Sequence, residues 1–114
     1  MGNNVFYIYI RLRGASWAAL PPAVRNTVTS NDGEGMIAHL CVYKEAEVEQ
    51  ALVETAHFWK ESMVGSQADV SGAELVMHQI QVANGGLELS PATIGCIAQA
   101  DLSLHMARTT CQLK

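Results

Sequence analysis

The pattern of hydrophobic and polar positions is clearest over residues 5–13, where the two kinds of side chain alternate along the chain. One parity holds Phe6, Ile8, Ile10 and Leu12, and the other holds Val5, Tyr7, Tyr9, Arg11 and Arg13. Because successive side chains of a strand point to opposite faces, this alternation predicts a β-strand. One of its faces is apolar and the other amphipathic, as in a sheet that is covered on one side.

Residues 45–63 have helical periodicity instead. Val48, Leu52, Thr55, Trp59 and Met63 recur every three or four positions, which predicts a long amphipathic helix. A second, shorter helix is predicted from Ser90 to about residue 100, because serine followed by proline is a common helix start.

The remaining elements follow from shorter patterns. A helical turn is predicted over residues 16–20, where Pro21 and Pro22 stop or restart it. The glycine-rich turn over residues 31–35 joins two β-prone runs, 26–30 and 36–43, into a hairpin. Residues 73–83 and 102–110 are two further strands.

The faces of the last two strands follow from their parity. In residues 73–83 we take Val76 and Ile80 as core residues, so that His78, of the same parity, also points inward unless the strand is bulged. In residues 102–110 the inward residues are Leu102, Leu104 and Met106, with His105 facing outward.

These elements predict an α+β fold, a single two-layer domain over residues 1–114. Its sheet is expected to be mostly antiparallel with four to five strands, packed against one long helix and one or two short ones. The first six elements follow the ferredoxin-like order β-α-β-β-α-β, with one helix and one strand added.

Two segments carry a resemblance. The strand and glycine over residues 6–14, and Leu87 to Pro91 before the last helix and strand, are similar to the ends of a small bacterial domain family of unknown function. The tryptophan segment that this family has after its hairpin turn has no counterpart here. The resemblance implies the order of elements and no activity. In size and acidity the chain also resembles the class of small proteins that confer immunity to toxins.

Composition supports a folded domain with an acidic surface. Of the 114 residues 49% are apolar and 16% charged, which is opposite to the composition of disordered chains. The net charge is −4, although residues 1–25 contain three arginines and no acid. An acidic chain disfavours nucleic acid as the main partner and favours a basic protein.

The sequence also bears on location. The longest apolar run, from Val5 to Ile10, is far shorter than the ~20 residues of a membrane span, and no basic segment precedes it as in a signal peptide. Cys41, Cys96 and Cys111 are odd in number and widely spaced, so no disulfide framework or zinc site is expected. We expect a cytoplasmic protein, with Cys41 and Cys96 buried as small hydrophobic residues.

The leading candidate site is the polar face of the long helix. Glu47, Glu54 and Glu61 recur every seven residues, with Gln50 and His57 between them. An acidic line of this length suits a basic surface such as a nuclease toxin. We therefore expect a protein-binding module, specifically an immunity protein that neutralises a toxin by direct binding, with no catalytic residues and no cofactor.

Two alternatives remain. The outer face of the first strand, with Tyr7, Tyr9, Arg11 and Arg13, and with His105 from the last strand, could stack RNA bases or form a homodimer interface. Alternatively His39, His78 and His105 could come together in a small-ligand or metal-dependent enzyme if their strands are neighbours.

Overall fold

The computed structural model describes residues 5–12, 20–31, 34–64, 73–81 and 89–110. Their elements, in chain order, are β1 (Val5–Arg11), α1 (Pro22–Arg25), β2 (Thr29–Asn31), β3 (Glu34–Val42), the 3-10 helix η2 (Glu45–Glu47), α2 (Val48–Ser62), β4 (Glu74–Gln81), α3 (Pro91–Gln99) and β5 (Ser103–Thr110). This confirms the predicted α+β fold and the order of its larger elements.

The strands form one five-stranded sheet in the order β2-β3-β1-β4-β5. Neighbouring strands are antiparallel except for β4 and β5, which are parallel. Because β3 and β4 both run antiparallel to β1 between them, α2 has to cross over β1 to connect them. α3 and β5 then extend the sheet beyond β4.

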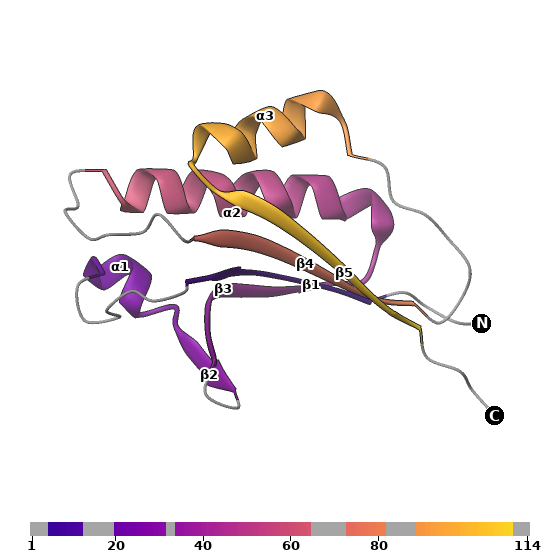
Figure 1. The fold of residues 1–114 in the computed structure, drawn as a ribbon, viewed down its shortest axis with the longest axis horizontal. Helices are drawn as coiled ribbons and strands as arrows, with labels where there is room; N and C mark the ends of the chain where they lie inside the picture. The colour runs from indigo at the N-terminus through magenta and orange to yellow at the C-terminus, as the bar shows by residue number, and fades with distance from the viewer. Residues whose placement is uncertain (1–4, 13–19, 32–33, 65–72, 82–88, 111–114) are drawn as a thin grey trace.

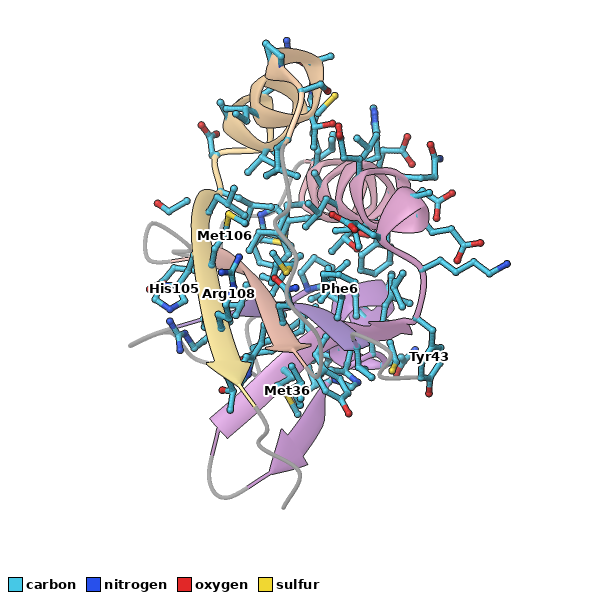
Figure 2. The ribbon with its side chains drawn as sticks, turned by 90° about the vertical axis from the view of Figure 1, so that its right-hand side faces the viewer. Phe6, Met36, Tyr43, His105, Met106 and Arg108 are labelled. Atoms are coloured by element: carbon cyan, nitrogen blue, oxygen red, sulfur yellow. The ribbon has the colours of Figure 1, made fainter. Side chains whose placement is uncertain are left out.

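The molecule has two layers. In Figure 1, α2 and α3 lie on the same face of the sheet, and α1 lies near one end of it. No described helix covers the middle of the opposite face, which we call the open face. Figure 2 shows Phe6 on the helical side of the sheet and Met36 on the other.

The alternation in β1 builds the core. Phe6, Ile8, Ile10 and Leu12 are buried beneath the helices, whereas the intervening residues of the strand are half-buried. From α2 the residues Val48, Leu52, Thr55 and Trp59 pack onto the same side, as their spacing predicts.

β4 differs from the prediction in its faces. Leu75 and Met77 pair with Ile10 and Ile8 of β1, and directly paired residues share a face, so this parity points into the core. His78 pairs with Tyr7 and therefore lies on the open face. The inward orientation expected for His78 is wrong, because β4 is apolar on both faces near its start and its own pattern does not decide between them.

The chain between β1 and β3 also differs in detail. Of the helical turn expected over residues 16–20, residues 16–19 lie outside the described part, and the short helix begins at Pro22 instead. Proline suits this first position because its missing N–H has no partner there in a helix. Asn26 and Thr27 form a turn, so β2 begins only at Thr29. The hairpin itself is confirmed, with Asn31 opposite Glu34.

The start of α3 is tied to the start of α2. Ser90 is the predicted N-cap, and its hydroxyl accepts a hydrogen bond from the backbone N–H of Thr93 at 3.4 Å. Glu49 of α2 accepts hydrogen bonds from the Ser90 hydroxyl at 2.8 Å, from the Ser90 backbone N–H at 3.2 Å and from the Thr93 hydroxyl. These bonds, with Thr93 as the largest contributor, lower the pKa of Glu49 below its usual 4.5.

The lowered pKa of Glu49 makes stability depend on pH. The unfolded chain takes up this proton near pH 4.5, so the contribution of Glu49 is complete above that value. It is lost as the pH falls through the lower pKa of the folded state. We therefore expect the native protein to lose more stability between pH 7 and pH 3 than the Glu49→Gln variant does, measured by urea unfolding at each pH. Glu45→Gln, at an exposed position of η2, is the control. Equal losses in all three proteins would contradict the role of Glu49.

Candidate functional site

The polar face of α2 lies in solvent, as predicted. Glu47, Gln50, Glu54, His57 and Glu61 are all exposed, and the Gln50 side-chain amide donates a hydrogen bond to Glu54 at 3.0 Å. Glu54 and Glu61 are two turns apart on α2, and Glu47 precedes them by seven residues as the last residue of η2 and the N-cap of α2. We call these three residues the acidic line.

A pocket of about 490 Å³ lies beside the acidic line, between α2 and β3. Its lining is mostly apolar and consists of Thr27, Ala38, His39, Leu40, Glu54, Thr55 and Phe58. Glu54 therefore belongs both to the acidic line and to the wall of the pocket. Leu40 is 40% exposed there, although it lies on the helical side of the sheet. The pocket can receive an apolar side chain next to a carboxylate.

The outer edge of β3 borders this pocket. Within the described residues, β2 pairs with β3 only at Glu34, Gly35 and Met36. From Ala38 to Val42 the strand has β1 on one side and no described strand on the other. The Thr27 hydroxyl accepts a hydrogen bond from the backbone N–H of Ala38 at 3.3 Å, which satisfies one group of this edge.

A β-bulge sets which side chains of β3 enter the pocket. Between Ile8 and Ile10, β1 has one residue, Tyr9, where β3 has two, Ala38 and His39. Ala38 has a positive φ of 54°. The extra residue shifts the alternation, so that Leu40 faces the helical side and His39 faces the open face.

Charge is concentrated around this site. Residues 45–61 contain five acids and one lysine, a formal charge of −4 that equals the net charge of the whole chain. Glu54 lies at the pocket itself, and Glu45, Glu47 and Glu61 are exposed along the same stretch of chain, so this stretch favours cations.

The open face carries the second set of predicted residues. His39 stacks on Tyr7 with ring centroids 5.6 Å apart and lies 6.0 Å from the ring of Tyr9. Arg11 forms an ion pair with Glu74 across β1 and β4 at 2.8 Å, so its charge is balanced within the molecule. Arg13 lies outside the described residues, and His105 is exposed on β5, opposite Val76.

The three candidate metal ligands share the open face without forming a site. His39 and His78 lie on either side of Tyr7, and His105 lies on the next strand beyond His78. The His78 ring is 2.7 Å from the Thr109 hydroxyl, with which it shares a hydrogen bond. In the described part of the chain, no three His, Cys, Asp or Glu side chains gather closely enough to hold a metal ion.

The cysteines differ from expectation. Cys41 is exposed and Cys96 is half-buried, and both are free thiols. Cys41 lies on the open face because it pairs with Tyr7, and the bulge at Ala38 fixes this orientation. A hydrogen bond with Cys41 raises the pKa of the neighbouring Tyr43.

Sequence reasoning found the acidic line and missed the pocket. Phe58 could have indicated the pocket from the sequence, because it is a large apolar residue that does not belong to the apolar series of the helix, which ends with Trp59 and Met63. Leu40 gave no such signal, because its orientation depends on the bulge. Thr27 and Ala38 could not be predicted as pocket residues, because this depends on the pairing of β2 with β3, which ends at Met36.

Comparisons of this chain with protein-family models, with curated proteins and with solved structures give no match. Among the described helices, none combines the length and the apolar character needed to cross a membrane.

Proposed function

We propose that this chain is a protein-binding module that recognises a basic partner protein through the acidic line of α2. The observation that carries the proposal is that Glu47, Glu54 and Glu61 are all exposed along one side of the helix, with Glu54 at the wall of an apolar pocket. A surface on which acidic and apolar groups lie side by side is complementary to a partner surface with basic and apolar residues.

The partner class that fits this surface best is a basic toxin domain, which would make the chain an immunity protein. Such a protein acts by occupying its target, so it needs an exposed complementary surface and no catalytic group. The proposal includes a cytoplasmic location, which the free thiols of Cys41 and Cys96 support because unpaired cysteines are typical of a reducing compartment.

The open face supports an RNA-binding function less well. Tyr7, Tyr9 and His39 offer rings on the two strands β1 and β3, which favours base stacking. RNA binding also needs cations for the phosphates, and the guanidinium of Arg11 already pairs with Glu74. A net charge of −4 adds repulsion.

Charge reversal tests the protein-binding proposal. The partner that co-purifies from the native host is identified, produced separately, and its association rate is measured at low and high salt. We expect Glu47→Lys, Glu54→Lys and Glu61→Lys together to slow association about tenfold or more at low salt, because they reverse the steering potential. The difference should shrink as salt screens the charges.

A matched pair of single variants makes this test specific. Glu54→Lys and Glu45→Lys change the net charge equally, and both positions are exposed, but Glu45 does not line the pocket. Glu54→Lys should have the larger effect. If the triple variant associates at the native rate, the acidic line is not the binding surface.

A further inference from the structure

We infer that the partner binds as an extended segment, which adds as a strand to the outer edge of β3 between Ala38 and Val42. One of its apolar side chains fills the pocket between α2 and β3, and basic residues beside it meet Glu54 and its neighbours. This inference rests on the proposed function and deepens it, since it names the form in which the partner is recognised.

The backbone of β3 supplies the first part of the argument. A strand edge presents N–H and C=O groups that an added strand can bond, and main-chain hydrogen bonds of this kind give affinity in peptide recognition. Beyond Met36 no described strand lies on the outer side of β3. Within the described residues the edge therefore has no strand partner beside the pocket, and the Thr27 hydroxyl bonds only the N–H of Ala38 at its start.

The pocket supplies the second part. In strand addition, specificity comes from pockets that take alternate side chains of the added segment. Leu40, Thr55 and Phe58 line such a pocket directly beside the open edge, and its volume of about 490 Å³ is ample for a leucine or a phenylalanine. A strand that lies against β3 would direct every second side chain toward α2.

Charge decides what occupies the edge. A second copy of this chain that paired through its own β3 would bring two acidic lines together, and like charges across an interface are unfavourable. A segment with lysine or arginine beside its apolar residue would instead pair with Glu54. The opposite edge of the sheet, β5, carries Arg108, which disfavours a basic segment there.

A synthetic peptide of about nine residues, in which lysine alternates with leucine and valine, is the test ligand. It is titrated into the isotopically labelled protein while amide signals and amide hydrogen exchange are followed by NMR. We expect saturable shifts from Ala38 to Val42 and slowed exchange within His39 to Val42, since the Ala38 N–H already bonds Thr27. A peptide with glutamate in place of lysine should bind more weakly, and so should one with a central proline, because proline removes a donor and cannot be accommodated in a bonded strand.

Two apolar residues of similar exposure, on strands toward opposite edges of the sheet, give matched variants. Leu40 lies on β3 and is 40% exposed, and Met106 lies on β5 and is 47% exposed. Leu40→Asn should raise the dissociation constant of the lysine peptide about tenfold, whereas Met106→Asn should leave it within about twofold. Circular dichroism checks that both variants fold, and the proline peptide tests strand addition without any variant.

The outcomes separate the two proposals. If charge reversal on α2 weakens the peptide but the proline peptide and Leu40→Asn have no effect, the acidic line binds basic segments and strand addition is wrong. If the β5 amides respond, or if Ala38 to Val42 are protected by self-association at high protein concentration, the inference is also overturned. A lysine peptide that does not bind at all overturns it, whereas the slower association of the intact partner would still support the protein-binding function.

Discussion

Replacing Trp59 by alanine should remove about 3–5 kcal/mol from the free energy of unfolding. Trp59 is 2% exposed and belongs to the core cluster between α2 and the sheet. Its loss removes the transfer energy of a large aromatic ring and leaves a cavity that surrounding residues fill only in part. Small domains are stable by about 5–15 kcal/mol, so one substitution would remove a large share of the total.

The adjacent residue provides the control. Phe58 is only half-buried at the pocket, so Phe58→Ala should cost clearly less stability than Trp59→Ala although it too removes an aromatic ring. Urea unfolding followed by circular dichroism measures both, and the midpoint for Trp59→Ala should fall by about 2 M. Peptide binding should show the reverse order: Phe58→Ala, which still folds, should lose more affinity for the lysine peptide than the folded fraction of Trp59→Ala does. Equal stability losses would contradict the assignment of Trp59 to the core and Phe58 to the pocket.

The parts of the fold that could be predicted from the sequence are those with a one-sided pattern. In β1 only one parity is fully apolar, and in α2 the series Val48, Leu52, Thr55 and Trp59 has the helical period, so the buried side is determined locally. The Ser90 cap is local too, because a serine hydroxyl bonds an amide three residues away.

The candidate site could be predicted only in part for the same reason. The acidic line is a property of one helix, and its exposure follows from the position of the apolar series on the other side. The pocket depends on three facts that involve separate segments: β2 ends its pairing at Met36, β3 has a bulge opposite Tyr9, and α2 contributes Glu54, Thr55 and Phe58 beside β3. None of these is visible in the periodicity of a single segment.

The bulge shows how a local strain changes a surface. Ala38 adopts a positive φ, which costs an alanine roughly 1 kcal/mol and has no signature in the sequence, since glycine or asparagine would be usual there. Without the extra residue, strict alternation from Ile37 would turn Leu40 to the open face and His39 to the helical side. The stacking of His39 on Tyr7 and the apolar wall at Leu40 are thus two consequences of one bulge.

The second large effect concerns β4, where the local pattern misleads. Met77 is 1% exposed beneath the helices, and its partner in β1 is Ile8, whereas Ile80 is half-buried on the open face. Met77→Ala should therefore cost about 2–5 kcal/mol, and Ile80→Ala should cost less, since part of the Ile80 side chain already contacts water.

This pair of variants decides between two orientations of one strand. Val76 and Ile80 are the β-branched residues of β4 and share one parity, whereas the glutamines Gln79 and Gln81 have the other. When the strand is taken alone, this pattern favours the face of Val76 and Ile80 as the core face. Pairing with β1 reverses this, because residues directly opposite each other must share a face and the face of β1 is fixed by Phe6, Ile8 and Ile10. Urea unfolding of both variants measures the difference, with circular dichroism as the signal. A larger loss for Ile80→Ala than for Met77→Ala would mean that β4 is turned by one residue, which would also move His78 from the open face into the core.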